Sequence, residues 1–405
     1  MTGAIFRPET AADVVDAIRD GQGPLAIEGG GGLKGLGRPI QAAATLKLDR
    51  LTGVVEYSPT ELYVTFQAGT PLADARQALA EKRQRLPFDP PDLTRLYQGG
   101  GADGPATIGG VVAAALSGPA RVALGAARDY LIGANFVDGS GNPIRGGGKV
   151  MKNVTGYDLC KLTTGAFGSL GAITATTFKV LPVAPAEVTL ALVGLDDAAG
   201  QAALSAAFRS PFEPLGAAHL PADIARLIDA APGEDALTLV RLEGFPESLA
   251  YREQAIRAYL PKQADILVLK DEASAALWAA IRDVAPFQAP DDRPLWRLST
   301  APTAGPALTA KLKSALGGSA YFDWAGGLIW FAPPTGAADA GAAIVRPAAH
   351  AAGGHATLMR APEATRAAVD VFEPLSAPIL KLTSGLKAQF DPKGRLNPGR
   401  MYAGV

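Results

Sequence analysis

The chain has 405 residues, of which 48% are hydrophobic and 19% charged, so it is long enough to form two domains with sizeable cores. Its formal net charge of -1 excludes the strongly basic surface that nucleic-acid binding requires. A single cysteine, Cys160, excludes an internal disulfide and an iron–sulfur cluster held by this chain alone. We therefore expect a reducing, cytoplasmic setting.

The first twenty residues predict a short strand and then an amphipathic helix that begins at Pro8–Glu9–Thr10. This pattern differs from a secretion signal, which has a basic region before a long apolar core. The most apolar stretch, residues 108–127, is interrupted by glycine, proline and arginine, so it is not expected to span a membrane. We expect a soluble chain.

Up to about Pro185, short β-branched runs alternate with helices and glycine-dense turns, which predicts an α/β arrangement. In ELYVTFQAGTPLADARQALAEK a strand pattern changes to a helix pattern, with Thr70 as the expected cap and Pro71 in the first turn. We expect a first domain at residues 1–185, a second at 186–388, and a C-terminal tail at 389–405 that returns to the first domain.

The second domain combines alanine-rich helices with apolar strands, which predicts a mixed α+β arrangement. The segment YFDWAGGLIWFAPP predicts a hairpin around Ala325–Gly326–Gly327. The strand–helix patterns of residues 187–270 and 295–360 are compatible with two related halves.

A first glycine cluster, Gly29 to Gly32, follows a predicted strand. Residues without side chains allow backbone N–H groups to converge on an anion, which predicts a pyrophosphate cradle. The run is not a GxGxxG motif before a long helix, and Lys34 is followed by Gly35, so neither a Rossmann motif nor a P-loop is supported. A flexible surface loop is the alternative.

Two further clusters have the same composition. Thr107, Gly109 and Gly110 precede a small-residue helix, whose N-terminus is predicted to lie beside phosphate oxygens. The third cluster runs from residue 146 to residue 174, where spaced glycines before a threonine-rich strand predict backbone held against a flat ligand. Lys152 and Arg128 are either phosphate contacts or solvated charges.

Four motifs between residues 106 and 185 carry a family resemblance: GVVAAALSGPAR, ARDYLIGANFVDGSG, GGGKVMKNVTGYDL and GAFGSLGAITATTFKVLP. They resemble the FAD-binding domain of the vanillyl-alcohol oxidase and p-cresol methylhydroxylase superfamily. VMKNVTGYDL and SGPAR are especially similar to the E-subunit family of bacterial glycolate oxidase, and a thinner similarity extends to the terminal LNPGRM. The implied fold is α+β, a two-domain FAD-binding fold with a ferredoxin-like α+β cap domain.

In that superfamily FAD lies extended between the two domains. The resemblance implies non-covalent FAD here, because the His or Cys that attaches flavin in other members is missing at its place. Lys34 departs from the family loop, in which the lysine comes one place earlier. The implied cofactor-binding residues are Gly29, Gly30, Gly31, Gly32, Leu33 and Lys34 at the pyrophosphate, Thr107, Gly109, Gly110, Ser117 and Arg121 along the middle, Gly171 and Ile173 at the adenosine, and Asn397 at the flavin ring.

The resemblance also implies partners: a second FAD subunit that oxidises a 2-hydroxy acid such as glycolate, and an iron–sulfur subunit that passes electrons to a membrane acceptor. The chain would then reach the inner face of the cytoplasmic membrane through this complex. The related D subunit holds a metal beside its flavin with an HGDGN motif. This chain has three histidines, His219, His350 and His355, and no such motif, so we predict no metal site.

Oxidation of a 2-hydroxy acid needs a cation for the carboxylate, a base for the hydroxyl proton and a flavin for the hydride. Arg297 in LWRLSTAP and Arg360 in HATLMRAP are candidate carboxylate ligands, and structural salt bridges are the alternative. His355 is the candidate base, and a hydrogen-bonded structural role is the alternative.

Three tryptophans, Trp296, Trp324 and Trp330, would border the flavin ring or a partner surface, and ordinary core packing is the alternative. The leading hypothesis is a flavin subunit of a glycolate dehydrogenase complex. Two others stay open: a flavoenzyme that acts alone on another alcohol, and a structural subunit whose FAD only stabilises the assembly.

Overall fold

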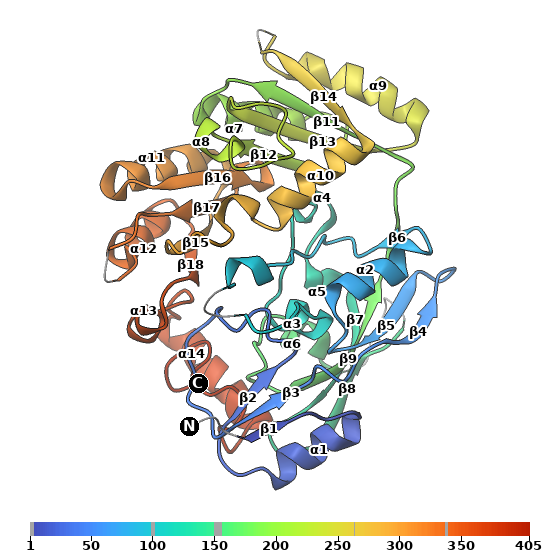
Figure 1. The fold of residues 1–405 in the computed structure, drawn as a ribbon, viewed down its shortest axis with the longest axis vertical. Helices are drawn as coiled ribbons and strands as arrows, with labels where there is room; N and C mark the ends of the chain where they lie inside the picture. Colours follow the sequence, from blue (N-terminus) through green and yellow to red (C-terminus); the bar gives the residue numbers. More distant parts are fainter. Residues whose placement is uncertain (1–3, 99–101, 150–155, 263, 337–338) are drawn as a thin grey trace. The chain divides into compact units, whose positions relative to one another are not determined.

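The computed structural model describes residues 4–98, 102–149, 156–262, 264–336 and 339–405. The chain divides into two compact units (Figure 1). The first unit contains Met1–Ser117, Ala126–Pro182 and Asp370–Val405, and the second contains Gly118–Gly125 and Val183–Val369. The division near Pro182 lies close to the expected boundary at 185, whereas the return to the first unit begins at Asp370 and not at residue 389.

The strands of the first unit form three sheets. A parallel sheet has the order β1 (Ala4–Phe6), β3 (Ala44–Lys47), β2 (Leu25–Glu28). An antiparallel sheet has the order β4 (Val54–Ser58), β5 (Tyr63–Gln67), β9 (Ala172–Lys179), β7 (Leu131–Val137), β8 (Pro143–Gly147). A short pair joins β6 (Gln84–Arg85) to β10 (Leu181–Pro182).

The first helix forms where the sequence predicts it. In α1 (Ala11–Asp20) the Thr10 hydroxyl accepts the Asp13 N–H at 3.1 Å, and Asp13 accepts the Thr10 N–H in return. The prediction for α2 (Leu72–Ala80) is wrong in one respect, because its cap residue is Pro71 and not Thr70. The Thr70 hydroxyl instead donates to the Gln67 carbonyl at 2.6 Å.

The remaining helices of the first unit are short except for the last. They are the 3-10 turn η1 (Thr94–Leu96), α3 (Ile108–Ala113), α5 (Ala127–Tyr130), α6 (Leu159–Thr163) and α14 (Ala377–Phe390).

The C-terminal tail is built into the core of the first unit. Leu396 is fully buried among Val14, Ile18 and Leu25, and it forms a parallel bridge with Leu25 at the start of β2. Burial of these side chains contributes roughly 1.5–3 kcal/mol each, so the tail helps to hold β2 and the glycine loop that follows it.

The second unit is organised around one antiparallel sheet. Its order is β14 (Ile266–Lys270), β11 (Ala186–Val193), β13 (Leu237–Gly244), β12 (Gly216–Leu220), β16 (Ser319–Asp323), β17 (Leu328–Ala332), β15 (Leu295–Ser299), β18 (His355–Arg360). The four strands before residue 271 and the four after residue 294 have mirrored orders, which meet at the pair His219 and Phe322. This order confirms two related halves, and β16 with β17 forms the predicted hairpin.

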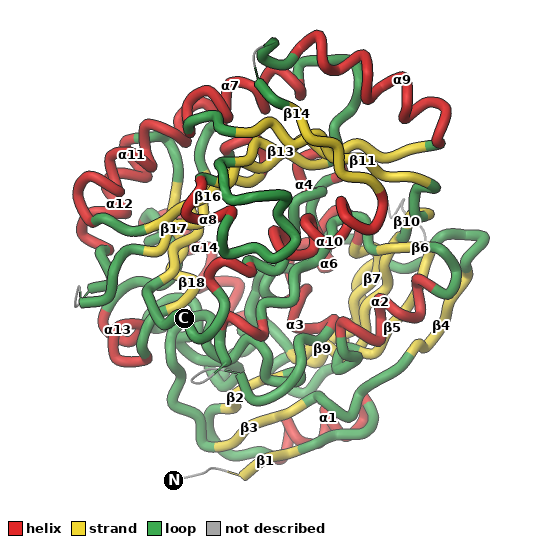
Figure 2. Tube along the Cα trace, turned by 45° about the horizontal axis from the view of Figure 1, so that its top comes forward, coloured by secondary structure: helices red, strands yellow, loops and turns green. Residues whose placement is uncertain are grey.

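Helices cover both faces of this sheet. Helices α7 (Asp197–Phe208) and α9 (Pro246–Ile256) pack on the face that carries Val188 and Leu190. Helix α10 (Asp271–Arg282) packs on the opposite face, where its Trp278 donates to the Thr189 hydroxyl at 2.7 Å. Helices α7, α11 (Gly305–Leu316) and α12 (Ala342–Ala351) follow one another along one border of the unit (Figure 2).

The other helical segments of the second unit are short. They are α4 (Arg121–Leu124), α8 (Ala222–Ala225), α13 (Glu363–Ala368), and the 3-10 turns η2 (Arg257–Tyr259), η3 (Ala285–Phe287), η4 (Pro302–Ala304) and η5 (Trp324–Gly326). Among the described residues of both units, no helix has the length and apolar character that crossing a membrane requires.

Candidate functional site

The first glycine cluster forms a loop directly after β2, and its backbone amides have the features of an anion site. The N–H groups of the five residues from Gly29 to Leu33 donate no hydrogen bond to any residue that the structure describes. Gly30, Gly31 and Gly32 are nevertheless buried. Buried N–H groups without a partner are uncommon in folded proteins, and a bound anion would satisfy them. The loop therefore fits a pyrophosphate.

The glycines of this loop are required by close packing against residues 103–107. A Cβ atom on Gly29 would lie 2.2 Å from the Thr107 hydroxyl oxygen, and a Cβ atom on Gly30 would lie 2.3 Å from the Pro105 carbonyl oxygen. Gly31 has a φ angle of +97°, a conformation that L side chains rarely adopt. The first two glycine clusters are therefore packed against each other, which makes the loop a fixed structure.

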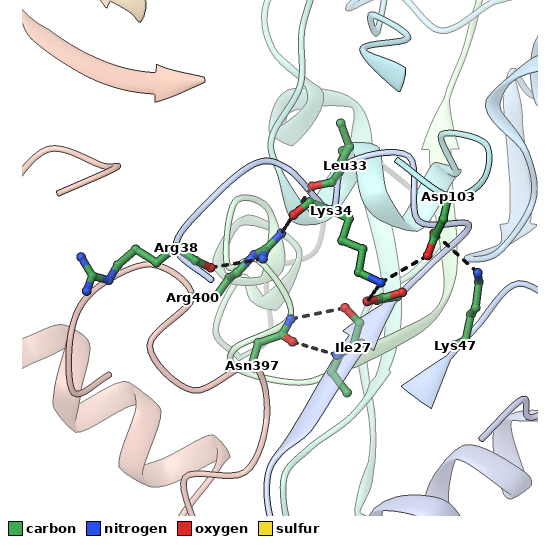
Figure 3. A network of polar contacts seen from close by, with 9 residues as sticks. Ile27, Leu33, Lys34, Arg38, Lys47, Asp103, Asn397 and Arg400 are labelled. Carbon is green, nitrogen blue, oxygen red and sulfur yellow. Dashed lines mark hydrogen bonds and ion pairs between the residues drawn. The ribbon is translucent and has the colours of Figure 1, made fainter. Parts of the chain in front are cut away.

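Asn397 of the C-terminal tail holds the strand that leads into the loop (Figure 3). Its side-chain oxygen accepts the Ile27 N–H at 2.7 Å, and its side-chain amide donates to the Phe167 carbonyl at 2.6 Å. Its own N–H donates to the Leu25 carbonyl at 3.0 Å. The side chain is buried and its donor and acceptor are engaged within the protein, so in this structure Asn397 positions the loop.

Arg400 and Lys34 fix the far end of the loop (Figure 3). The Arg400 guanidinium donates to the Leu33 and Lys34 carbonyls at 3.3 and 3.1 Å. The Lys34 ammonium contacts Glu28 at 3.3 Å and Asp103 at 3.2 Å. Burial lowers the pKa of Lys34, but the carboxylates of Glu28 and Asp103 outweigh burial and raise it.

In the described parts of the chain, the amides of the second glycine cluster have partners within the protein, unlike those of the first. Thr107 caps α3 by accepting the Gly110 N–H at 3.3 Å, and the Gly109 N–H donates to the Ala68 carbonyl at 2.7 Å. These amides are already hydrogen-bonded within the protein, so they do not form the predicted helix-terminus site for phosphate oxygens. Gly109 is needed for contact, because a Cβ atom there would lie 2.8 Å from the Ala68 carbonyl oxygen.

The remaining predicted cofactor residues of the first unit lie on other elements. Ile173 is a buried residue of β9 that pairs with Phe136 of β7, and Gly171 packs against the ring of Phe136. The Ser117 hydroxyl accepts the Ala127 N–H at 3.1 Å. Lys152 lies outside the described residues.

The predicted site residue Arg121 belongs to the second unit, where it meets Arg297. Both guanidinium groups stack on the indole ring of Trp324, with Cζ to centroid distances of 4.7 Å for Arg121 and 5.1 Å for Arg297. The indole N–H donates to the Gly118 carbonyl at 3.1 Å, which holds the ring in place. The alternative for Trp324, ordinary core packing, does not describe this arrangement.

The surroundings of Arg297 disfavour its positive charge. Burial and the neighbouring Arg121 lower the pKa of Arg297 to about 10, against the opposing effect of Asp323. No hydrogen bond or ion pair joins the Arg297 guanidinium to another residue in the described parts of the chain. The salt bridge considered as the alternative for Arg297 is therefore not formed there.

Arg360 and His355 are the other two candidate catalytic residues. Arg360 is 8% exposed, donates to the Arg293 carbonyl at 2.9 Å and lies 3.6 Å from an Asp291 carboxylate oxygen. This is the structural ion pair considered as the alternative for Arg360, so the structure does not group it with Arg297. His355 is exposed at the start of β18, an edge strand, two residues along from the partner of Arg297.

The other notable side chains have structural contacts. Trp296 is fully buried and donates to the Ala340 carbonyl at 2.8 Å, and Trp330 is buried within β17, so core packing describes both. His219 is buried and lies 2.8 Å from the Thr238 hydroxyl. No group of three or more His, Cys, Asp or Glu side chains within the described ranges is arranged to hold a metal ion.

Comparison with known proteins identifies the family. A family model described as FAD binding domain matches residues 2–147. The chain is 34% identical over 392 residues to the glycolate oxidase subunit GlcE of Escherichia coli (strain K12), and this match covers 96% of the chain and 95% of that protein. The chain belongs to the GlcE family. It is therefore an FAD-binding oxidoreductase subunit, as the motifs predict.

Two further similarities are consistent with GlcE membership. The glycolate oxidase subunit GlcD of Bacillus subtilis (strain 168) is 30% identical over 206 residues, which cover 50% of this chain and 42% of that protein. The crystal structure of p-cresol methylhydroxylase with substrate bound has a TM-score of 0.73 at 15% identity and covers 98% of this chain and 88% of that chain. This second similarity confirms the predicted fold.

Sequence reasoning missed two residues that shape the glycine loop, Asp103 and Arg400. Asp103 pairs with Lys34 and lies 3.7 Å from Lys47, and Arg400 binds the loop carbonyls. The signal for Arg400 was its position in LNPGRM, three residues after Asn397. Asp103 gave no comparable signal, because a single acid in a glycine-rich turn is compatible with simple solvation.

Proposed function

We propose that this chain is the FAD-binding subunit of a multi-subunit glycolate dehydrogenase, which oxidises glycolate to glyoxylate and passes electrons to an iron–sulfur partner. The similarity to GlcE over 95% of its length supports this proposal, because the E. coli relative is by name a subunit of glycolate oxidase. The structural observation that carries it is the row of amides from Gly29 to Leu33, which have no hydrogen-bond partner among the residues that the structure describes.

Different residues of the first unit would bind FAD and hold the binding loop in place. The five amides from Gly29 to Leu33 would hold the pyrophosphate, while Asn397 and Arg400 keep the loop in its binding conformation. When bound, FAD supplies the hydride acceptor that oxidation of an alcohol needs. With no covalent attachment proposed, the flavin is expected to be released by denaturation as unmodified FAD.

Helix α14 provides a surface for a partner subunit. Ile379, Leu382 and Leu386 are spaced by three and four residues, so they lie on one helical face, and all three are exposed, Leu382 by 65%. Lys381, next to Leu382, is exposed, whereas Lys387 is buried and paired with Asp391. An apolar exposed stripe of this kind is typical of an interaction site. The matching partner is another subunit with an apolar groove and a carboxylate that faces Lys381.

The partner surface is tested by co-purification. Leu382→Glu should reduce recovery of the co-expressed partner subunits at least tenfold while the FAD content stays unchanged. Leu227→Glu, which changes a 51% exposed leucine of the second unit, is the matched control and should have no effect. Equal recovery with both variants would remove α14 from the interface. Release of Leu382→Glu from phosphatidylglycerol vesicles, with partner recovery intact, would assign the helix to lipid instead.

The function is tested by anaerobic titration of the co-purified complex with glycolate. We expect the flavin absorbance to bleach in the complex and to stay unchanged in the isolated chain. Full bleaching of the isolated chain would show that it oxidises glycolate without partners. A complex that contains FAD and is not reduced by glycolate would contradict the proposed substrate.

A further inference from the structure

We propose that Arg121, Trp324 and Arg297 form a binding site for a small carboxylate anion in the second unit. This site deepens the proposed function, on which the choice of carboxylate rests, because it places a substrate-class ligand on this chain and not only on a partner. All three residues belong to the second unit.

The geometry of the cluster favours an added anion. Two guanidinium groups share the indole of Trp324, and the one carboxylate whose charge acts on Arg297 within the described chain is that of Asp323. Asp323 is itself buried, and its Oδ1 atom accepts the Trp324 N–H at 2.7 Å. The Arg297 guanidinium thus has no hydrogen-bonded counter-charge among the described residues, and a bound anion would supply one.

The sheet places these charges on one face. Arg297 of β15 is paired with Trp330 of β17, which is paired with Tyr321 of β16, and Asp323 lies two residues beyond Tyr321. Paired residues share a face, and residues two apart on one strand do as well. The adjacent Trp296 belongs to the opposite face, where Arg346 stacks on its ring. Arg297 thus lies opposite the face on which Arg346 and Trp296 meet.

The backbone that carries the Trp324 indole is strained. Trp324 and Ala325 have φ angles of +50° and +58°, in the left-handed region that non-glycine residues rarely adopt. Two such residues in succession are retained when the surrounding structure constrains them, which is frequent at ligand sites. The Gly118 carbonyl accepts both the indole N–H and the Arg121 N–H, at 3.1 Å each, so one atom connects the tryptophan to the helix of the first arginine.

The bound anion would complete the Arg297 environment. A guanidinium offers five N–H donors in a planar fork that matches a carboxylate, and Arg297 uses none of them in a described contact. Burial and Arg121 lower the pKa of Arg297 to about 10, so the group still carries its proton at neutral pH and is available to bind. Phosphate could satisfy the same charge, and the experiment below separates it from a carboxylate.

The test is calorimetric titration of the FAD-containing chain with oxalate, a dicarboxylate with no hydrogen on carbon to lose as a hydride. We expect saturable binding of oxalate, weaker binding of phosphate and none of glycolamide, the neutral analogue of glycolate. Arg297→Gln and Arg121→Gln should each weaken oxalate binding at least tenfold. Arg346→Gln, which removes a stacked arginine from Trp296, is the matched control and should bind as the parent does.

Tryptophan fluorescence provides a second readout. Oxalate should change the emission of the chain, and Trp324→Phe should remove that change while calorimetric binding persists. Absence of oxalate binding, unchanged affinity in both arginine variants, or equal affinity for phosphate and oxalate would each overturn the proposal. These outcomes leave the FAD content and the reduction of the complex by glycolate untouched, so failure of this site is distinct from failure of the proposed function.

Discussion

The glycine loop of the first unit and the arginine–tryptophan cluster of the second are both suited to anions, but they use different parts of the chain. The loop presents backbone amides from Gly29 to Leu33 and excludes side chains by close packing. The cluster presents side chains, with Arg121 and Arg297 stacked on Trp324. The loop depends on the absence of Cβ atoms, whereas the cluster depends on strand register and a strained turn. Substitutions should therefore affect the two sites in different ways.

The largest effect is expected in the loop. In Gly30→Ala the new Cβ atom would lie 2.3 Å from the Pro105 carbonyl oxygen, so the loop must move and its amides lose their alignment. We expect FAD affinity to fall by roughly a hundredfold, which corresponds to about 2.7 kcal/mol. The measurement is flavin content after dialysis, followed by titration of the apoprotein with FAD.

Gly385→Ala, in helix α14 of the same unit, is the control for this loop substitution. No atom lies within 4 Å of a Cβ atom added to Gly385, so the variant should retain FAD at the parent level. If Gly30→Ala also retained FAD, the amides of the loop would not be the pyrophosphate site.

Asn397 should show the next effect, since it supports the loop from the tail. Asn397→Ala leaves the half-buried Ile27 N–H and Phe167 carbonyl without their partner. Each such group costs about 1–3 kcal/mol, so the free energy of unfolding should fall by about 2–4 kcal/mol and FAD affinity with it. Urea unfolding of the apoprotein measures the first quantity and FAD titration the second.

The role assigned to Asn397 can be separated from direct flavin contact. In Asn397→Asp the acceptor for the Ile27 N–H remains, but the donor to Phe167 is replaced by a carboxylate oxygen. Both substitutions should then destabilise the apoprotein. A large loss of FAD affinity with an unchanged free energy of unfolding would instead return Asn397 to the flavin ring, where the family resemblance places it.

The two sites also differ in how far sequence could predict them. Four consecutive glycines after a strand are a local signal, and they predicted a loop that the structure places directly after β2. The contacts of Asn397 could not be predicted, because Ile27 lies 370 residues away in the chain. Thr107 was correctly predicted at a helix start. The Gly109 N–H that follows it donates to the Ala68 carbonyl, and no local sequence pattern predicts this long-range bond.

The cluster of the second unit had even less local signal. Arg121, Arg297 and Trp324 come from three separated segments that sheet pairing and a single turn bring together. Sequence reasoning therefore treated Arg121 as a cofactor residue and grouped Arg297 with Arg360. The fold itself was predicted from the family motifs between residues 106 and 185, and the hairpin at residues 325–327 from strand periodicity, because both are properties of short segments.

Removing the Arg297 charge should have a smaller effect on the free energy of unfolding, and one of opposite sign to that of the Asn397 variants. A folded-state pKa lowered to about 10 means that folding disfavours the protonated form. This cost is fully present below the folded pKa, and it is relieved as the pH rises from about 10 toward the ordinary arginine value. Arg297→Gln should therefore leave the free energy of unfolding unchanged or raise it by up to about 1 kcal/mol.

The measurement is urea unfolding of both proteins without added anion at pH 6.5, 7.5 and 8.5. The difference between them should be the same at all three values, because Arg297 keeps its proton throughout this range. Oxalate binding should also be independent of pH here, whereas a histidine cation as the ligand would be lost between pH 6.5 and 8.5. A destabilisation above 1 kcal/mol would show that Arg297 has a structural role.

Substitution of Gly385, which unlike Gly30 has room for a Cβ atom, gives the smallest predicted effect. This glycine lies inside α14, and an added Cβ atom there would meet no atom within 4 Å. Because glycine in a helix interior costs about 0.5–1 kcal/mol relative to alanine, Gly385→Ala should raise the free energy of unfolding of the isolated chain by about that amount. Unchanged stability would indicate that α14 is not helical without its partner. If stability rises but co-purification of partner subunits falls, the partner backbone approaches Gly385 closely, and this glycine too is retained for contact, although with another chain.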